Sequence, residues 1–311
     1  MFVKNLKQIS KENVSVAGGK GASLGEMINS GFSVPNGFVV LASAFENFLK
    51  ETNINIEINT IWNRLNIKSN ENIEKNSEII KAIVLKKKFP EKLGKEILSF
   101  FDKLNTNYVA VRSSATAEDS KIDSWAGQLE SYLFVDKNNL LKYIQKCWAS
   151  LYTPKALFYR VERKLSGKPV SVAVVIQKMI NSKVSGVCFT VHPVTRDKKQ
   201  MIIEACWGLG EALVQGIITP DNYVIEKSTF SLVDININSQ GKKMVRKGKG
   251  VISTPVPKSQ RKKQKLNIKQ IQELSRICVK IEKHYKRPQD IEWALVKEKF
   301  YILQSRPITT L

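Results

Sequence analysis

The chain has 311 residues, with 50 Lys and Arg against 28 Asp and Glu, and its formal net charge is +22. Hydrophobic residues make up 42% of the sequence, which predicts a folded chain with a sizeable core and excludes a disordered one. No apolar run reaches the roughly 18–20 residues that span a bilayer, and the N-terminus lacks the apolar segment of a secretion signal. We therefore expect a cytoplasmic protein with no membrane partner.

The numbers and positions of the histidines and cysteines limit the kinds of catalytic site, metal site and disulfide that we expect. The sequence has two histidines, His192 and His284, which argues against a Ser-His-Asp triad or a histidine-rich metal site. The four cysteines lie far apart and form no C-x-x-C pair, as expected for a reducing compartment rather than a zinc site or a disulfide framework. The cysteines are Cys147, Cys188, Cys206 and Cys278.

The positive charge by itself would suggest a nucleic-acid partner. However, most of the basic residues are lysines spread along the whole chain, beside many Asn and Ile residues, which is also typical of an AT-rich genome. The densest basic runs are not interleaved with aromatic residues, so they lack the stacking platform of single-strand binders. We predict no nucleic-acid partner; a nucleic-acid binder would instead be retained on DNA in a salt-sensitive way.

The predicted helices and strands mix without strict alternation, which favours α+β lobes over a Rossmann domain. In chain order, the patterns predict a glycine-rich turn within 16–30 that leads into a short helix ending at Gly31, and then a helix over 44–50 with surface helices between 52 and 107. They predict strands over 108–112 and 131–135, a helical stretch over 140–163, and strands over 170–179, 184–191 and 201–207. Last come an exposed loop over 241–265, a helix over 268–285, and strands over 290–296 and 299–306.

A glycine-rich turn, Gly-Gly-Lys-Gly at 18–21, precedes the first helix. Glycines let backbone N–H groups approach phosphate oxygens closely, and Lys20 supplies a mobile positive charge. The turn is not a Walker A loop, because a glycine follows Lys20 where Ser or Thr is required. A tight turn with a solvated lysine is the alternative.

Arg112 ends a predicted strand and is followed by small hydroxyl residues, a combination that suits phosphate binding. The alternative is an ion pair between Arg112 and Glu118 or Asp119. Further on, Gly127 and Ser131 could offer a close backbone approach and a hydroxyl to the same phosphates, or could form a turn that leads into a strand.

Gln177 follows a run of apolar strand residues. A polar side chain at the end of such a strand could meet an adenine edge. It could equally contact water at the edge of a sheet.

Two strands near the C-terminus form a predicted hairpin around Glu298. If the hairpin is centred there, Glu292 lies opposite Gln304, and because side chains alternate along a strand, Asp290 and Arg306 share their face. A carboxylate and an amide oxygen fit Mg²⁺, which takes one or two carboxylates together with phosphate oxygens and water. The alternative is a solvated outer face of an edge hairpin.

In this order, the motifs resemble the ATP-binding domain shared by phosphoenolpyruvate synthase, pyruvate phosphate dikinase and the rifampin phosphotransferases. The resemblance runs essentially from end to end. It rests on GGKGASLGEM (18–27), VPNGFVV (34–40), AVRSSATAED (110–119), SWAGQLES (124–131), CWASLY (147–152), QKM (177–179), SGVCFTVHPVT (185–195), EACWGLGEALVQG (204–216), PDNY (220–223), and DIEWA with ILQSRPIT (290–294 and 302–309).

The resemblance implies a two-lobed ATP-grasp fold, with phosphate loops in residues 1–178 and a metal-binding hairpin in residues 179–311. It implies ATP and Mg²⁺ as cofactors. It further implies that Lys20, Arg112 and Arg306 hold phosphates and act in catalysis. The remaining implied contacts are Gly127 and Ser131 to phosphate, Gln177 to adenine, and Glu292 and Gln304 to Mg²⁺.

In this family the ATP domain phosphorylates a histidine on a swivelling domain, which carries the phosphoryl group to pyruvate or an antibiotic. The sequence ends five residues after Arg306, and neither histidine lies in a glycine- and threonine-rich phosphohistidine context. We therefore expect an ATP-dependent phosphotransferase of the phosphoenolpyruvate synthase type whose acceptor histidine is on a separate chain or domain. The alternatives are the ATP-binding part of a rifampin-phosphotransferase-like enzyme and a nucleotide-binding protein without catalysis.

Overall fold

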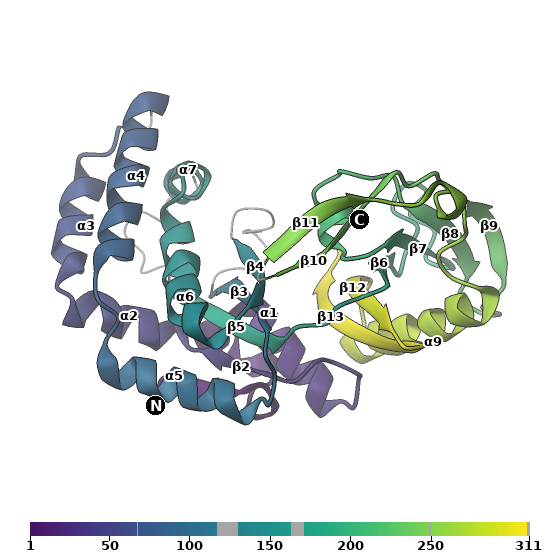
Figure 1. The fold of residues 1–311 in the computed structure, drawn as a ribbon, viewed down its shortest axis with the longest axis horizontal. Helices are drawn as coiled ribbons and strands as arrows, with labels where there is room; N and C mark the ends of the chain where they lie inside the picture. Colours follow the sequence, from purple (N-terminus) through teal and green to yellow (C-terminus); the bar gives the residue numbers. More distant parts are fainter. Residues whose placement is uncertain (67, 117–129, 163–170, 249, 310–311) are drawn as a thin grey trace. The chain divides into compact units, whose positions relative to one another are not determined.

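A computed structural model describes residues 1–66, 68–116, 130–162, 171–248 and 250–309 (Figure 1). It contains both helices and sheets, so the α+β prediction is confirmed. The chain divides into two compact units, one of Met1–Asn29 with Asn36–Met179 and one of Ser30–Pro35 with Ile180–Leu311. Among the described residues, no helix combines the length and the apolar character that a membrane span requires.

The first unit is built on a five-stranded antiparallel sheet with the strand order β1-β2-β5-β3-β4. The central strands are almost wholly buried, which explains the run of valine, alanine and isoleucine in VAVVIQK of β5 and the apolar start of VAVRSSA in β3. The strands are β1 (Val3–Asn5), β2 (Gly37–Val40), β3 (Val109–Ala115), β4 (Ser131–Val135) and β5 (Val172–Lys178).

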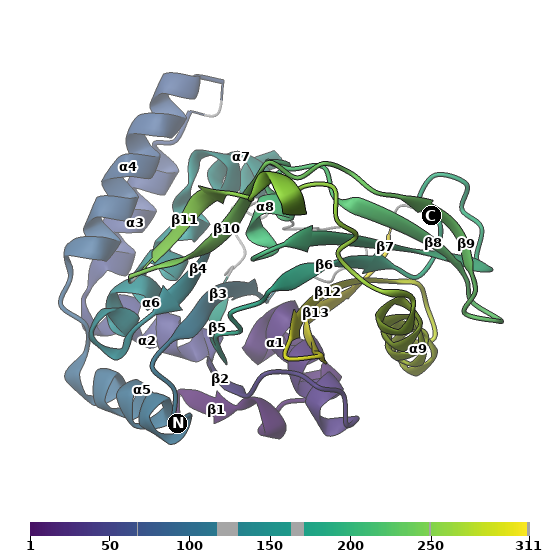
Figure 2. The same cartoon turned by 45° about the vertical axis from the view of Figure 1, so that its right-hand side comes forward.

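Helices cover both faces of this sheet (Figure 2). The first helix, α1, contacts β3 and β5 on one face, while α2 and α6 pack on the other face over the main hydrophobic core. The helices predicted between 52 and 107 are present, and they also fill that core through residues such as Ile80 and Ile97. The helices are α1 (Val14–Asn29), α2 (Ala42–Glu51), α3 (Ile54–Asn63), α4 (Asn70–Lys86), α5 (Glu91–Lys103), α6 (Leu140–Ala149) and α7 (Pro154–Glu162).

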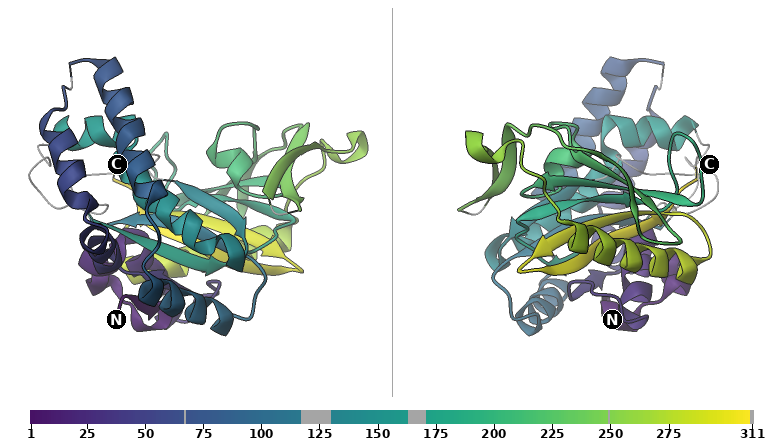
Figure 3. Two further views of the ribbon diagram at one scale, coloured as in Figure 1. Left: turned by 60° about the vertical axis from the view of Figure 1, so that its left-hand side comes forward. Right: turned by 90° about the vertical axis from the view of Figure 1, so that its right-hand side faces the viewer.

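The second unit contains a six-stranded antiparallel sheet with the order β13-β12-β6-β7-β8-β9. The helix α9 (Ile268–Tyr285) runs across one face of this sheet (Figure 3), and the predicted helix has these same bounds. A short helix, α8 (Glu211–Val214), follows β7. The strands are β6 (Val184–Phe189), β7 (Gln200–Trp207), β8 (Asp221–Glu226), β9 (Leu232–Asn236), β12 (Gln289–Val296) and β13 (Lys299–Pro307).

The prediction of an exposed loop over 241–265 is wrong. This segment contains an antiparallel hairpin of β10 (Lys242–Lys247) and β11 (Gly250–Pro255). No face of this hairpin is fully buried, so its sequence can be rich in Lys, Gly and Ser, a composition that is typical of loops. A two-stranded sheet is marginal by itself in water, so its stability depends on anchors at its base.

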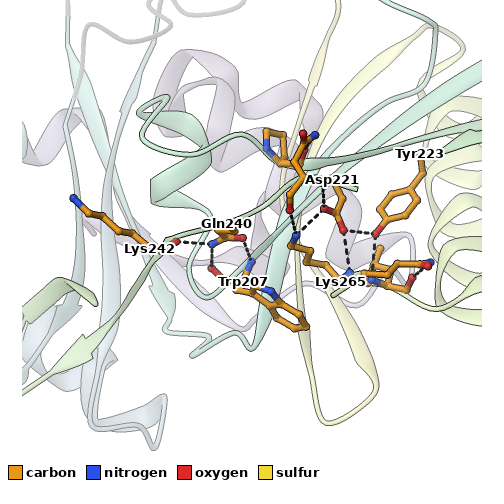
Figure 4. Close-up of polar contacts among 10 residues, drawn as sticks. Trp207, Asp221, Tyr223, Gln240, Lys242 and Lys265 are labelled. Carbon is orange, nitrogen blue, oxygen red and sulfur yellow. Dashed lines mark hydrogen bonds and ion pairs between the residues drawn. The ribbon is translucent and has the colours of Figure 1, made fainter. Parts of the chain in front are cut away.

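One anchor is the Gln240 side chain (Figure 4). Its oxygen accepts a hydrogen bond from the Trp207 backbone N–H (2.8 Å), and its amide donates to the carbonyl groups of Trp207 (3.1 Å) and Lys242 (2.8 Å). Gly208 also pairs with Met244 of β10, at a φ of 86° where a Cβ would collide with the Met244 carbonyl oxygen. The hairpin is therefore tied to the end of β7.

The second anchor is a fully buried ion pair at the end of the predicted loop. Lys265 Nζ lies 2.7 Å from Asp221 Oδ1, and both side chains are 0% exposed (Figure 4). Asp221 also accepts hydrogen bonds from the Tyr223 hydroxyl (3.0 Å) and the Asn238 backbone N–H (3.0 Å). These contacts connect β8 to both ends of the segment that carries the β10–β11 hairpin.

Candidate functional site

The glycine-rich turn lies inside α1, where the helix is interrupted at Gly18 with φ 70° and ψ 168°. Ser114 of β3 fixes the turn, because its hydroxyl donates to the Ala17 carbonyl (2.9 Å) and accepts from the Gly21 N–H (3.2 Å). A Cβ at Gly18 would overlap Ser114, so this position requires glycine. The structure thus brings two predicted motifs together, placing the turn that carries Lys20 against the strand that carries Arg112.

Arg112 lies within β3 rather than at its end, so the predicted strand boundary is wrong. The strand continues to Ala115 because its small hydroxyl residues satisfy buried backbone groups. Ser113 Oγ donates to the Glu130 carbonyl (2.8 Å), and Ser114 Oγ donates to Ala17 as above. Each hydroxyl has a single proton, and in this structure both protons are donated inside the protein.

Three predicted residues share one face of the first sheet. Arg112 is directly opposite Ser131 of β4, and Gln177 of β5 is opposite Ala110, two residues along β3 from Arg112. Alternation along the strand puts Arg112, Ser131 and Gln177 on the α1 side, where Gly21 contacts Val175. Gln177 is 2% exposed and Ser131 is exposed. Gly127, like the proposed pairing partners Glu118 and Asp119, lies outside the described residues.

In the second unit, the predicted pairing of Glu292 with Gln304 is present in the β12–β13 hairpin. The turn consists of Lys297 and Glu298, both with left-handed φ values (47° and 59°), as in a two-residue hairpin turn. A regular ladder from this turn would place Glu292 opposite Leu303. A β-bulge shifts the register between Glu292 and Trp293, and this extra residue brings Gln304 opposite Glu292.

Asp290 and Arg306 form an ion pair on the same face. Arg306 Nε and Nη2 lie 2.9 Å and 2.8 Å from Asp290 Oδ2. Asp290 Oδ1 is buried and has no hydrogen-bond partner among the described residues. Burial raises the pKa of Asp290, although Arg306 opposes that shift. One oxygen of this carboxylate is therefore paired and the other is left desolvated.

The sheet register adds one residue to this face that the motif analysis missed. Glu292 of β12 is opposite Val187 of β6, and Val187 is opposite Glu204 of β7. Directly opposite residues share a face, so Glu204 stands in one row with Glu292 and Gln304. Burial raises the pKa of Glu204, and Asp290 adds to the shift. A single glutamate within the apolar strand IIEACW was the available sequence signal.

This face carries the oxygen donors that a magnesium-nucleotide complex requires. Glu292 and Gln304 supply a carboxylate and an amide oxygen, and the desolvated Asp290 Oδ1 lies two residues along β12. Among the described residues, no three His, Cys, Asp or Glu side chains are grouped closely enough to hold a metal by themselves. The donors therefore fit Mg²⁺, which completes its shell with phosphate oxygens and water, better than a metal held in an all-protein cage.

Comparison with known proteins decides the family. Residues 14–311 match the family described as the AMP/ATP-binding domain of pyruvate phosphate dikinase. The chain belongs to this family. The fold is accordingly an ATP-grasp fold, as the sequence resemblance implied.

Curated relatives of this dikinase domain cover the whole chain. A probable phosphoenolpyruvate synthase of Methanocaldococcus jannaschii is 42% identical over 318 residues, and the phosphoenolpyruvate synthase of Pyrococcus furiosus is 37% identical over 358 residues. A rifampicin phosphotransferase of Bacillus cereus is 38% identical over 319 residues. The match includes 100% of this chain in each case, but only 27%, 44% and 36% of these relatives.

The two histidines of this dikinase-family domain have structural partners. His192 Nδ1 accepts hydrogen bonds from the backbone N–H groups of Val194 (3.3 Å) and Thr195 (3.1 Å), which stabilises the turn after β6. His284, near the end of α9, packs edge-on against Phe32 with ring centroids 6.2 Å apart.

Proposed function

We propose that this chain binds ATP with Mg²⁺ and donates a phosphoryl group from ATP to a histidine on a separate chain or domain, as part of a phosphoenolpyruvate synthase-like dikinase. The single observation that carries the proposal is the pairing of Glu292 with Gln304 beside the Asp290–Arg306 ion pair, in a chain of the dikinase ATP-binding family. A phosphoryl acceptor elsewhere agrees with the structural roles of His192 and His284.

The residues of each unit have separate tasks in this proposal. Lys20 and Arg112 neutralise phosphate charge, with Ser131 and Gly127 contacting the phosphates and Gln177 reading the adenine edge. Glu292 and Gln304 would hold Mg²⁺, which would neutralise part of the phosphate charge. Arg306 holds the terminal phosphates. Phosphoryl transfer depends mainly on such positioning and charge neutralisation, so no covalent chemistry by the domain itself is required.

Calorimetric titration with ATP, with and without Mg²⁺, tests the nucleotide assignment. We expect binding that Mg²⁺ strengthens, and we expect Glu292→Ala to abolish the strengthening while metal-free affinity remains. Glu273→Ala, which removes an exposed carboxylate from α9, is the matched control and should behave as the wild type. No binding at millimolar ATP would contradict the proposal, and an unchanged Glu292→Ala variant would refute the metal assignment.

A labelling experiment tests the separate acceptor. The wild-type chain, incubated with ATP labelled at the β or the γ phosphorus, should acquire no acid-labile label. Label that disappears in His192→Ala or His284→Ala would show that the acceptor is in this chain and would overturn that part of the proposal.

A second candidate is the ATP-binding part of an antibiotic phosphotransferase. The Bacillus cereus rifampicin phosphotransferase supports it, because its identity to this chain is close to that of the phosphoenolpyruvate synthases. The acceptor-binding partner separates the two, since a pyruvate-binding barrel favours the first and a hydrophobic antibiotic-binding domain favours the second. A nucleotide-binding protein without catalysis is the remaining alternative, and ATP binding without turnover in the presence of a phosphohistidine partner would support it.

A further inference from the structure

The polar face of the six-stranded sheet carries three carboxylates from separate positions in the chain. They belong to Glu204, Asp290 and Glu292, and the buried Asp290 Oδ1 has no hydrogen-bond partner among the described residues. Arg306 is paired with one oxygen of Asp290. Among the described residues, Glu204 forms no side-chain hydrogen bond and no ion pair with a cation, and its electrostatic neighbour is the second carboxylate, Asp290. Desolvated carboxylates in this arrangement favour a bound cation.

The position of Glu204 relative to the metal pair follows from strand spacing. Glu292 and Glu204 are separated by the single strand β6, so their backbones are about 10 Å apart. Between them on that face stands Val187, which has a short apolar side chain. This separation goes with the lack, among the described residues, of three His, Cys, Asp or Glu side chains grouped closely enough to hold a metal directly. It does suit a carboxylate that reaches the ion through water.

We propose that Glu204 is an outer ligand of the bound divalent cation, accepting hydrogen bonds from water molecules that stay on the Mg²⁺ held by Glu292 and Gln304. The inference rests on the proposed magnesium-nucleotide function. Mg²⁺ dehydrates reluctantly and keeps several waters, so a carboxylate beyond direct reach contributes by orienting them. Groups in this second layer commonly change metal affinity tenfold or more when removed. Glu204 is thus a positioning residue.

The test uses Mn²⁺ as the probe, because free Mn²⁺ is measured directly by electron paramagnetic resonance. The full chain is titrated with Mn²⁺ in the presence of the β,γ-imido analogue of ATP, and nucleotide affinity is measured separately in a metal chelator. We expect Glu204→Gln to weaken Mn²⁺ binding about tenfold in the nucleotide complex. Metal-free nucleotide affinity and thermal stability should stay unchanged, which a merely structural role would not produce.

Asp234→Asn is the matched control, because Asp234 lies on the same face of the sheet but on β9, two strands beyond Glu204. It removes the same charge and should change Mn²⁺ affinity less than twofold. Glu204→Asp keeps the charge on a shorter side chain and should recover part of the loss, and it also serves if Glu204→Gln does not fold.

The outcomes separate this inference from the proposed function. If the wild type binds neither nucleotide nor Mn²⁺-nucleotide, the proposed function fails. If the wild type binds Mn²⁺-nucleotide and Glu204→Gln binds it within twofold of the same affinity, only the role of Glu204 is overturned. An equal loss in Asp234→Asn would also overturn it, because the effect would then be one of overall charge.

Discussion

The polar faces of the two sheets carry opposite charges. On the five-stranded sheet, the face contacted by α1 presents Arg112 beside the turn that carries Lys20. On the six-stranded sheet, the face opposite α9 presents Glu204, Asp290 and Glu292 together with the partly exposed Arg306. A nucleotide phosphate needs the first kind of surface and its counter-cation needs the second. The charge of each face therefore indicates which kind of ion that face suits, whereas the net charge of +22 does not indicate a ligand.

The two faces are also supported in different ways. In the first unit, the backbone turn at Gly18 lies directly against Ser114 of β3, where there is no room for a side chain. In the second unit, the register of four strands sets the face, and the buried Asp221–Lys265 ion pair connects the following segment to β8. The first arrangement depends on the absence of one methyl group, and the second depends on many backbone hydrogen bonds and one salt bridge.

The largest expected effect is on the support of the second unit. Lys265→Met leaves Asp221 charged and buried without its cation, and loss of one partner from such a pair costs about 3–5 kcal/mol. Urea unfolding should show a loss of this size, whereas Lys263→Met, which changes an exposed lysine in the same segment, should stay within about 0.5 kcal/mol of the wild type. Equal stability of the two variants would show that the pair does not anchor the segment.

Arg112→Ala should have the next largest effect, and on nucleotide affinity. Loss of a charged hydrogen-bond donor to phosphate costs about 1.5–3 kcal/mol, or roughly 10- to 150-fold in affinity. Because phosphate charge is present with or without metal, titration should show the loss in both conditions. Glu292→Gln should weaken binding only when Mg²⁺ is present. If Mg²⁺ changes the affinity of both variants alike, the assignment of phosphate binding to Arg112 and metal binding to Glu292 is wrong.

Gly18→Ala tests the support of the first unit. A φ of 70° with a ψ of 168° is a conformation that only glycine adopts readily, and the added methyl group would overlap Ser114. We expect a loss of about 1–3 kcal/mol in thermal or urea unfolding. Gly216→Ala is the control, because Gly216 also has a positive φ (66°) but nothing lies within 4 Å of the added Cβ. A similar loss in both variants would assign the cost to the backbone alone.

The smallest effect is expected for basic residues outside the two faces. Arg246→Ala and Lys247→Ala remove exposed charges from β10, where Arg246 Nε donates to the Gly248 carbonyl. Each should change ATP affinity by less than about 0.5 kcal/mol. A larger change in calorimetry would show that the overall positive charge, rather than the residues on the sheet faces, attracts the nucleotide.

Much of the fold could be predicted because the type of many helices and strands follows from the residue pattern within each segment. The amphipathic period of α9 and the apolar run of β5 determine their type without reference to distant residues. The β10–β11 hairpin could not be predicted in this way. Its sequence has neither an alternating apolar face nor a buried one, and it is held by Gln240 and by Gly208, which lies 34 residues before Lys242.

At the candidate site, too, some features follow from the local sequence and others depend on contacts between distant residues. The sequence by itself determined the family resemblance, the glycine that the turn at 18–21 requires and the alternation that puts Asp290 and Glu292 on one face. Only the tertiary structure decided that a bulge completes the Glu292–Gln304 register, that Ser114 joins the glycine-rich turn to β3, and that Glu204 stands in the same row. The reason is physical: period and propensity act between near neighbours in the chain, whereas a row across a sheet depends on how strands distant in sequence pair.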